Sequence, residues 1–280
     1  MPATRVPNRL PPVARPRALI VALILLEVGA ISLLASGVAE TYEAVIRHSG
    51  LARFDQPMLD WMIAHRTPER NQLITLFTTF GGPIITPIVA AAVMIVLAWK
   101  WRSWTPVVMV LVAGAGSLAM TVIGKDYVER VRPPHELAVP PYEFSPSFPS
   151  GHALNSMALG GVIAYLICLH LTRRLSQVLV IVVALAYSLA MGTSRIYLGH
   201  HWLTDVVTGW LLGLLWLLMV IAGHRIGHRI VHHGPAPADP ESSAPPQGQL
   251  DEGRRGGGGI EVAPGEILDP GRGPGDRERA

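Results

Sequence analysis

Residues 203–222 read LTDVVTGWLLGLLWLLMVIA, an apolar run in which Asp205 is the only charged residue. About 20 such residues are enough to cross the hydrocarbon core of a bilayer as a helix. Working outward from this run, five similar runs occupy residues 18–39, 83–99, 105–124, 153–171 and 176–193. Backbone polar groups inside a bilayer must bond to one another, and the sequence lacks the alternating pattern of a barrel. The sequence therefore predicts an all-α fold, a bundle of six transmembrane helices.

The composition agrees with a membrane protein. Half of the 280 residues are hydrophobic and only 15% are charged, whereas soluble domains carry about 25% charged residues. The net charge of +3 comes from basic residues in short groups between the apolar runs. This pattern fits loops that fix the orientation of the chain and does not indicate nucleic-acid binding. The single cysteine, Cys168, lies inside a predicted span and cannot form an intramolecular disulfide.

Three parts of the chain lie outside or between the predicted spans. Residues 1–17 form a basic N-terminus. The apolar run that follows is longer than the core of a signal peptide, so we expect a retained first span. The stretch 40–82 mixes apolar and charged residues, which fits a helix at the membrane interface or a surface loop. The tail, residues 224–280, is rich in Pro, Gly and charge and is predicted to be disordered. This leaves residues 18–223 as the membrane domain.

The basic residues predict the orientation in the cell membrane. With the N-terminus in the cytoplasm, most basic groups lie on the cytoplasmic side, and so does the C-terminus. These groups are the early arginines, Lys100 and Arg102, Arg173 and Arg174, and Arg225 and Arg229. The loops on the opposite side also contain basic residues, against the rule, notably Lys125, Arg130, Arg132 and Arg195. Positive charge on the disfavoured side needs another reason, and binding of phosphate supplies one.

Two polar segments on that outer side, 125–152 and 194–205, combine cations with histidines and the start of a helix. Arginine grips phosphate oxygens with two parallel hydrogen bonds, and lysine acts as a point charge. Ser150 is expected to cap the fourth span, where Gly151 lets the backbone approach an anion and free N–H groups face it. His152 lies in the first turn beside the same anion site.

His201 and Asp205 are four residues apart, a spacing that places them on one face if a helix begins near residue 201. The carboxylate can then hold one imidazole nitrogen as N–H and leave the other bare toward a substrate. A nucleophile or base that is oriented by an acid recurs in covalent catalysis. His200 is five residues from Asp205, so we assign it to packing or to the mouth of the site.

These segments resemble the type 2 phosphatidic acid phosphatase superfamily, whose signature reads K-x6-RP, then PSGH, then SR-x5-H-x3-D. The match is complete and in order, from Lys125 to Pro133, from Pro149 to His152 and from Ser194 to Asp205. The resemblance implies three catalytic roles: His201 as the nucleophile that forms a phosphohistidine, Asp205 as its orienting acid, and His152 as the proton donor. It also implies a phosphate site without metal or cofactor, made of Lys125, Arg132, Ser150, Gly151 and Arg195.

The resemblance therefore predicts an integral membrane hydrolase that removes phosphate from a lipid at the extracytoplasmic surface. The pattern fits a phosphomonoester such as phosphatidic acid and a polyprenyl diphosphate such as undecaprenyl diphosphate equally well. A phosphotransferase that uses the same phosphohistidine is the alternative enzyme. A lipid-binding or transport protein without catalysis is the alternative from another class, but the paired histidines count against it. The related vanadate-dependent haloperoxidases are soluble, unlike this apolar chain, and the oligomeric state is left open.

Overall fold

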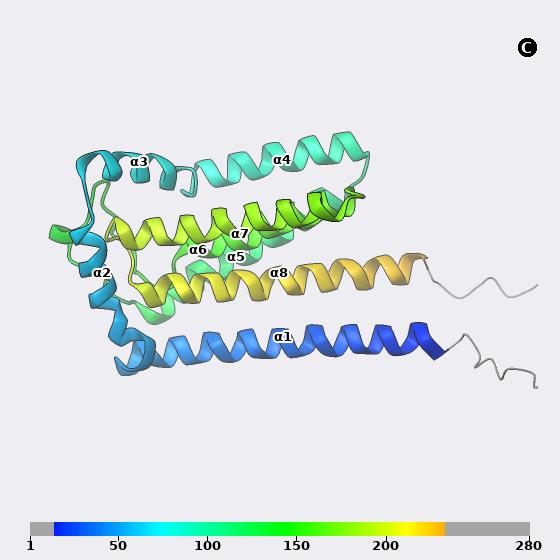
Figure 1. Ribbon diagram of the computed structural model, residues 1–280, viewed down its shortest axis with the longest axis horizontal. Helices are drawn as coiled ribbons and strands as arrows, with labels where there is room; N and C mark the ends of the chain where they lie inside the picture. Colours follow the sequence, from blue (N-terminus) through cyan, green and yellow to red (C-terminus); the bar gives the residue numbers. More distant parts are fainter. Residues whose placement is uncertain (1–13, 233–280) are drawn as a thin grey trace, which may run out of the picture. The chain divides into compact units, whose positions relative to one another are not determined.

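The run that begins at Leu203 forms the first part of helix α8 (Leu203–His232) in the computed structural model, which describes residues 14–232 (Figure 1). Seven α-helices precede it: α1 (Ala14–Arg47), α2 (Asp55–Ala64), α3 (Pro68–Thr79), α4 (Ile85–Trp101), α5 (Thr105–Val128), α6 (Gly151–Leu169) and α7 (Arg174–Tyr197). Short 3-10 helices occupy Gly50–Phe54 and His135–Leu137. No strand occurs within residues 14–232, so the prediction of an all-α fold is confirmed.

Five of these helices are long and apolar enough to cross a bilayer. Their spanning parts are Val21–Arg47, Thr105–Val128, Gly151–Leu169, Arg174–Tyr197 and Leu203–His228. The remaining predicted span forms α4, which has 17 residues. A helix of that length measures about 25 Å, slightly less than the roughly 30 Å of hydrocarbon in a bilayer. The six apolar runs of the sequence therefore each form one helix, and the predicted count of spans is consistent with the structure.

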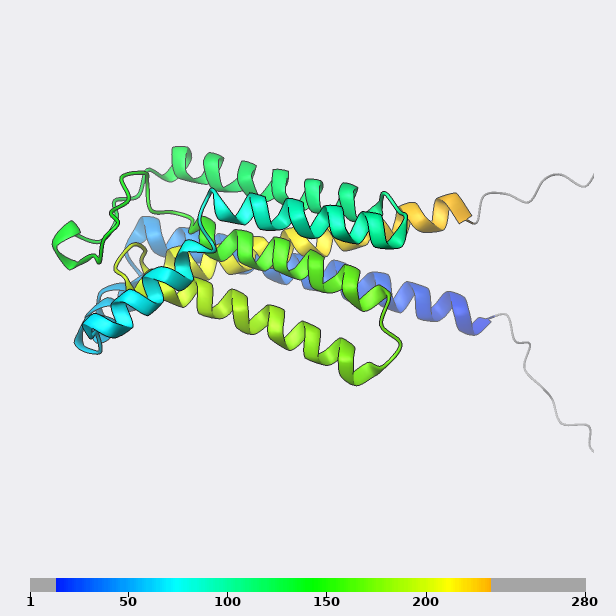
Figure 2. The same cartoon turned by 90° about the horizontal axis from the view of Figure 1, so that it is seen from above.

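Helix α6 lies at the centre of the bundle, where it packs against α5, α7 and α8 (Figure 2). Half of the residues in its apolar spanning stretch are buried inside the protein, the largest share among the five long spans. Val162 and Leu166 of α6 form a core with Met109 of α5 and Val220 of α8. Helix α1 packs on α8, and α4 packs on α5. The central helix is thus surrounded by spans, and its first turn is held in a defined position.

Two glycines let α8 approach α6 closely. A Cβ on Gly209 would lie 2.7 Å from the carbonyl oxygen of Ser150, and one on Gly213 would lie 2.7 Å from that of Leu154. Glycines four residues apart on one helix face are typical of close helix contacts in membranes. Because Gly209 is about one turn after Asp205, this contact holds the start of α8 beside the start of α6.

The segment between the first two spans is helical. Helix α1 continues to Arg47, past its predicted end at residue 39, and α2 and α3 follow. In Figure 1, α2 lies across one end of the bundle. Asp55, Leu59 and Met62 of α2 are buried, whereas Trp61 is exposed. The sequence predicts a helix or a surface loop within residues 40–82, and the structure has helices there, whereas their position at a membrane interface stays a prediction.

Helix α8 continues past residue 223, where the change in composition predicts the start of the tail. The imidazole Nδ1 of His224 lies 3.1 Å from the hydroxyl of Tyr165 on α6. Contact between the two helices therefore extends beyond the apolar run, and the helix itself continues to His232. The rest of the predicted tail, residues 233–280, and residues 1–13 lie outside the described residues.

Candidate active site

The residues of the three polar motifs lie at one end of the bundle. Helices α5 and α7 end there, and α6 and α8 begin there (Figure 1). The last turns of α5 and α7 carry Lys125 and Arg195. The first turns of α6 and α8 carry His152 and Asp205. The antiparallel order of the helices thus brings distant parts of the sequence together around His201, which is 1% exposed.

The carboxylate of Asp205 faces one edge of the His201 ring. Its Oδ2 lies 3.5 Å from Nδ1 of His201. The hydroxyl of Ser147 donates to the same oxygen and lies 3.4 Å from the same nitrogen. The backbone N–H of Trp202 also donates to Oδ2, at 2.9 Å. This bond is half of a capping box, since Trp202 is the residue before α8 and Asp205 is the third residue in it.

The spacing argument for His201 and Asp205 is corrected by where the helix begins. Helix α8 starts at Leu203, so His201 precedes it and the pair does not share a helical face. The backbone N–H of His201 instead donates to the carbonyl of Arg195, at 3.3 Å, in the tight turn that links α7 to α8. Gly199 takes a φ of +75° in this turn, a conformation that favours glycine. The turn, and not helical periodicity, places the ring beside the carboxylate.

The other edge of the His201 ring faces positive charge. An Nη1–H of Arg132 points to Nε2 of His201, at 3.2 Å. A guanidinium only donates hydrogen bonds, so this contact fits an Nε2 that carries a lone pair and an Nδ1 that carries the proton. Burial lowers the pKa of His201 well below its ordinary value, and Arg132 and Arg195 lower it further. The buried ring is therefore neutral, the form that a nucleophile requires.

Arg132 and Arg195 share a carboxylate that sequence reasoning missed. Glu143 accepts from Nη2 of Arg132 at 2.9 Å through Oε2, and from Nη2 of Arg195 through Oε1. Burial alone raises the pKa of Glu143, but Arg195, His201, Arg132 and His152 together lower it to about 2. The carboxylate is thus ionised. It holds the two guanidiniums in the way that two oxygens of a phosphate can hold them.

The other predicted phosphate ligands line the same end. The ammonium of Lys125 donates to the hydroxyl of Ser145, at 3.0 Å, and to the carbonyl of Pro146. Ser150 is the residue before α6, as expected, but its hydroxyl makes no capping bond. The Oγ of Ser150 is fully buried and has no hydrogen-bond partner among residues 14–232, and the same is true of Nε of Arg195. Two buried polar groups therefore remain available to an anion.

His152 and Gly151 are placed by close contacts with other helices. A Cβ on Gly81, in the break between α3 and α4, would lie 2.9 Å from Cδ2 of His152. A Cβ on Gly151 would lie 3.1 Å from Cγ2 of Thr121 on α5. Gly151 thus allows a close approach of α6 to α5. The sequence predicts instead that this glycine allows the backbone to approach an anion. His152 and His201 are both near enough to Glu143 to help lower the pKa of its carboxylate.

His200 is a packing residue. Its Nε2 lies 2.7 Å from the carbonyl oxygen of Val139, which holds the loop 133–149 against the end of α7. Burial lowers the pKa of His200 to about 4, and Arg195 contributes to the shift. The sequence left packing or the mouth of the site open for His200, and this contact with the loop backbone favours packing.

The comparisons with known proteins agree with this geometry. Residues 106–226 match the profile of the PAP2 superfamily. Phosphatidylglycerophosphatase B of Bacillus subtilis (strain 168) is 33% identical over 183 residues, which are 63% of this chain and 86% of that protein. The chain belongs to the PAP2 superfamily. A crystal structure of a transmembrane PAP2 type phosphatidylglycerolphosphate phosphatase from Bacillus subtilis superposes with a TM-score of 0.65 at 28% identity, over 70% of this chain and 96% of that one. The chain is therefore a multi-pass PAP2 lipid phosphatase of a membrane.

Several residues of this PAP2 site were not found from the sequence. Thr78 of α3 accepts from Nη1 of Arg195 at 3.2 Å, and Ser147 contacts Asp205. Glu143 and Ser147 lie in the irregular loop 133–149, where no periodic pattern indicates which side chains face the site. A signal did exist for Arg130, because it is a further cation on the side that the sequence predicts to be extracytoplasmic, in addition to those of the PAP2 signature.

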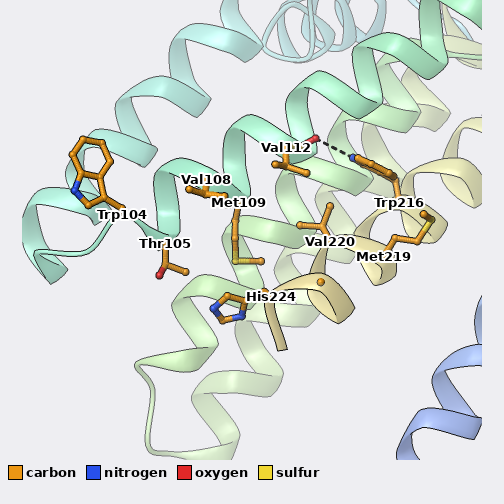
Figure 3. A pocket seen from close by; sticks show the side chains of 10 residues that line it. Trp104, Thr105, Val108, Met109, Val112, Trp216, Met219, Val220 and His224 are labelled. Carbon is orange, nitrogen blue, oxygen red and sulfur yellow. Dashed lines mark hydrogen bonds between the residues drawn. The ribbon is translucent and has the colours of Figure 1, made fainter. Parts of the chain in front are cut away.

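A separate apolar cavity of about 550 Å³ lies between α5 and α8 at the opposite end of the bundle. Figure 3 shows the side chains that line it, among them Trp104, Met109, Trp216 and His224. None of the PAP2 signature residues lines this cavity.

No group of three His, Cys, Asp or Glu side chains within residues 14–232 is arranged to hold a metal. The metal-free mechanism stays a prediction.

Proposed function

We propose that this PAP2 protein hydrolyses a lipid phosphate, either a phosphomonoester or a polyprenyl diphosphate, through a phosphohistidine on His201. The observation that carries the proposal is the two-sided setting of the His201 ring. Asp205 lies on its Nδ1 side, and the guanidinium of Arg132 lies on its Nε2 side. A neutral ring between an acid and an anion site has the arrangement that a nucleophile needs for attack on phosphorus.

In the first step, the phosphate displaces Glu143 and binds Arg132, Arg195, Lys125, the hydroxyl of Ser150 and the backbone at Gly151. The Nε2 lone pair forms a bond to phosphorus while the bond from phosphorus to the leaving oxygen breaks. His152 gives a proton to that oxygen, and the negative charge of the substrate favours its protonated form beforehand. Asp205 stabilises the charge that develops on the ring of His201, and the cations stabilise the charge on the phosphoryl oxygens.

In the second step, a water molecule attacks the phosphohistidine. Its oxygen bonds to phosphorus, one of its protons passes to His152, and the bond between phosphorus and Nε2 breaks. Free phosphate leaves, Glu143 returns to the arginines, and both histidines regain their initial protonation. An alcohol in place of water would give phosphotransfer.

The proposed orientation puts the site at the extracytoplasmic surface, with both termini in the cytoplasm. The site end of the bundle carries Lys125, Arg132 and Arg195, whereas Lys100, Arg102, Arg173 and Arg174 lie at the opposite helix ends. The latter set supports a cytoplasmic assignment for that end. The name of the Bacillus subtilis relative makes phosphatidylglycerol phosphate the first substrate to assay.

The test is phosphate release by the purified full chain in detergent micelles. Phosphatidylglycerol phosphate, phosphatidic acid and a polyprenyl diphosphate are compared, each with and without chelator. We expect turnover that is unchanged by chelator. His201→Ala should lose about 10⁴-fold or more of kcat, whereas His65→Ala, at an exposed histidine that directly follows α2, should match the parent chain. The labelled phosphohistidine should form in a quench experiment and be absent from His201→Ala.

Three outcomes count against the proposal. Full activity of His201→Ala would refute the nucleophile. Loss of activity with chelator would contradict the metal-free mechanism. Binding of the lipids without phosphate release would favour the non-catalytic alternative, and a phosphorylated alcohol with little free phosphate would identify a phosphotransferase.

A further inference from the structure

Arg130 lies behind the site, between two buried carboxylates. Its Nη1 donates to Oδ1 of Asp205 at 2.5 Å and to the hydroxyl of Thr204 at 2.7 Å. Its Nη2 donates to Oδ2 of Asp55 at 2.7 Å. The Asp55 and Asp205 side chains are 7% and 0% exposed, and that of Arg130 is 16% exposed. The guanidinium of Arg130 thus donates to two carboxylates and a hydroxyl behind the site, and it is not one of the predicted phosphate ligands.

Asp55 is itself fixed by the start of α8. Its Oδ1 accepts from the backbone N–H of Thr204 at 2.9 Å, and its Oδ2 accepts from the hydroxyl of Thr204 at 2.8 Å. The first N–H groups of a helix lack partners within the helix, and negative charge is favoured there. Asp55, in the first turn of α2, therefore caps α8 from another helix and holds Arg130 in place at the same time.

We propose that Asp55 and Arg130 are positioning residues of the reaction, acting through Asp205 on the nucleophile. The inference rests on the proposed phosphohistidine function of His201. With Oδ1 of Asp205 bound to Arg130, its Oδ2 is turned toward Ser147, the N–H of Trp202 and Nδ1 of His201. The guanidinium also offsets the charge of Asp205, so the carboxylate orients the ring without holding it as an imidazolium. The helix α2 thereby has a role in catalysis.

Charged side chains from three helices and one loop act on the His201 ring. Arg132 and Glu143 face it from the loop after α5, Lys125 from α5 and Arg195 from α7. Asp205 faces it from α8 and is the carboxylate that Arg130 contacts. Removal of Arg130 leaves the charge of Asp205 uncompensated beside the ring. An uncompensated negative charge favours the protonated imidazole, so the pKa of His201 should rise from its lowered value.

The test compares Arg130→Gln with the parent chain in steady-state assays over a range of pH. We expect kcat to fall by about 100-fold, the size of effect that a small misplacement of a catalytic group produces. KM should be unchanged, because Arg130 does not contact the phosphate ligands. The acid limb of kcat/KM, which reports the free enzyme, should move to higher pH. A purely structural role would reduce the amount of folded protein and leave this limb in place.

Matched variants sharpen the test. Arg130→Lys keeps the charge and should keep the position of the acid limb while it recovers part of kcat. Arg47→Gln removes an exposed arginine at the same end of the bundle and should behave as the parent chain. Asp55→Asn should lower kcat less than Arg130→Gln does. The double variant should fall no further than Arg130→Gln alone, because the two residues act in series.

The inference is overturned if Arg130→Gln keeps the parent kcat and acid limb, or if its loss lies wholly in KM, while His201→Ala is inactive. Active His201→Ala would instead remove the proposed function. If Arg130→Gln does not accumulate in membranes, the inference is tested with Arg130→Lys and Asp55→Asn instead. Parent values of kcat in both would overturn the inference.

Discussion

Arg130 and Arg132 are two residues apart in the sequence, yet they meet two different environments. Arg130 contacts Asp55 and Asp205, whose side chains are 7% and 0% exposed, in a network that ties α2 to α8. Arg132 contacts Glu143, whose side chain is 33% exposed and lies on a loop. A carboxylate fixed by a helix start is hard to displace, whereas a loop carboxylate at a partly open position can give way to a ligand. We infer that Arg130 belongs to the framework that holds the helices, whereas Arg132 is the arginine that binds the substrate phosphate.

The contacts of the two arginines with other groups agree with this division. Arg132 also donates to the backbone carbonyls of Ser145 and His200, at 2.6 Å each, so its guanidinium stays in place when Glu143 leaves. The guanidinium of Arg130 lies over the ring of Trp202, 5.7 Å from the ring centroid. One arginine keeps donors for an exchangeable anion, and the other is enclosed by fixed partners.

The largest effect that would test this comparison is expected for Arg132→Gln. Loss of one donor to the developing phosphoryl charge typically costs about 10²–10³-fold in rate. We expect kcat/KM to fall by that factor and competitive inhibition by inorganic phosphate to weaken with it. Arg130→Gln should lower kcat but retain phosphate inhibition. The same loss of phosphate inhibition in both variants would contradict the division between framework and substrate arginines.

A smaller effect, of opposite sign, is expected for Glu143→Gln. The ionised carboxylate competes with phosphate for Arg132 and Arg195, and the neutral amide competes less well. We expect inorganic phosphate to bind about tenfold more tightly, a change of about 1.4 kcal/mol, and to raise the melting temperature more than in the parent chain. Glu43→Gln, at an exposed glutamate on α1, is the matched control and should leave phosphate binding unchanged.

The pH dependence of the same competition follows from the lowered pKa of Glu143. Its folded pKa of about 2 lies below the ordinary value, so its ion pairs stabilise the fold above that ordinary value and are lost as the pH falls toward 2. Above pH 5 the carboxylate is fully ionised, so competition with phosphate should not change through its titration. An inhibition constant that varies strongly with pH above 5 in the parent chain, after correction for phosphate ionisation, would exclude this account of Glu143.

The framework side of the comparison was the harder one to predict from sequence. The six helices follow from apolar runs, and Lys125, Arg132 and Arg195 stand out as cations on the side that the sequence predicts to be extracytoplasmic. Both kinds of pattern are local in the chain. The contact of Asp55 with Arg130 joins residues 75 positions apart, and neither residue lies in a repeating pattern that points to the other. Such pairs depend on how α2 is folded over the end of the bundle.

Two local predictions were wrong for a related reason. Ser150 occupies the expected position before α6, but its hydroxyl makes no cap. The carboxylate of Asp205, in contrast, reaches back to the start of α8. His201 and Asp205 have the spacing of a helical pair, yet the turn after α7 delays the helix to Leu203. A functional site uses helix ends in ways that propensity alone does not specify.

The smallest effect on chemistry is expected for Gly209→Ala, which acts on both arginine environments at once. An added Cβ would lie 2.7 Å from the carbonyl oxygen of Ser150 and 2.9 Å from Cβ of Ala153, so α8 must move away from α6. Overpacking of this kind costs about 1–3 kcal/mol of stability. Because Asp205 is on α8 and Ser150 precedes α6, the shift changes the distance between Asp205, which Arg130 holds, and Ser150, a predicted phosphate ligand. We expect a lower melting temperature and a few-fold lower kcat, in keeping with a small misplacement of a catalytic group. Gly223→Ala, which has nothing within 4 Å of the added Cβ, should change neither. If Gly209→Ala loses stability but keeps the parent kcat, the two environments are set independently, and the helix contact does not couple them.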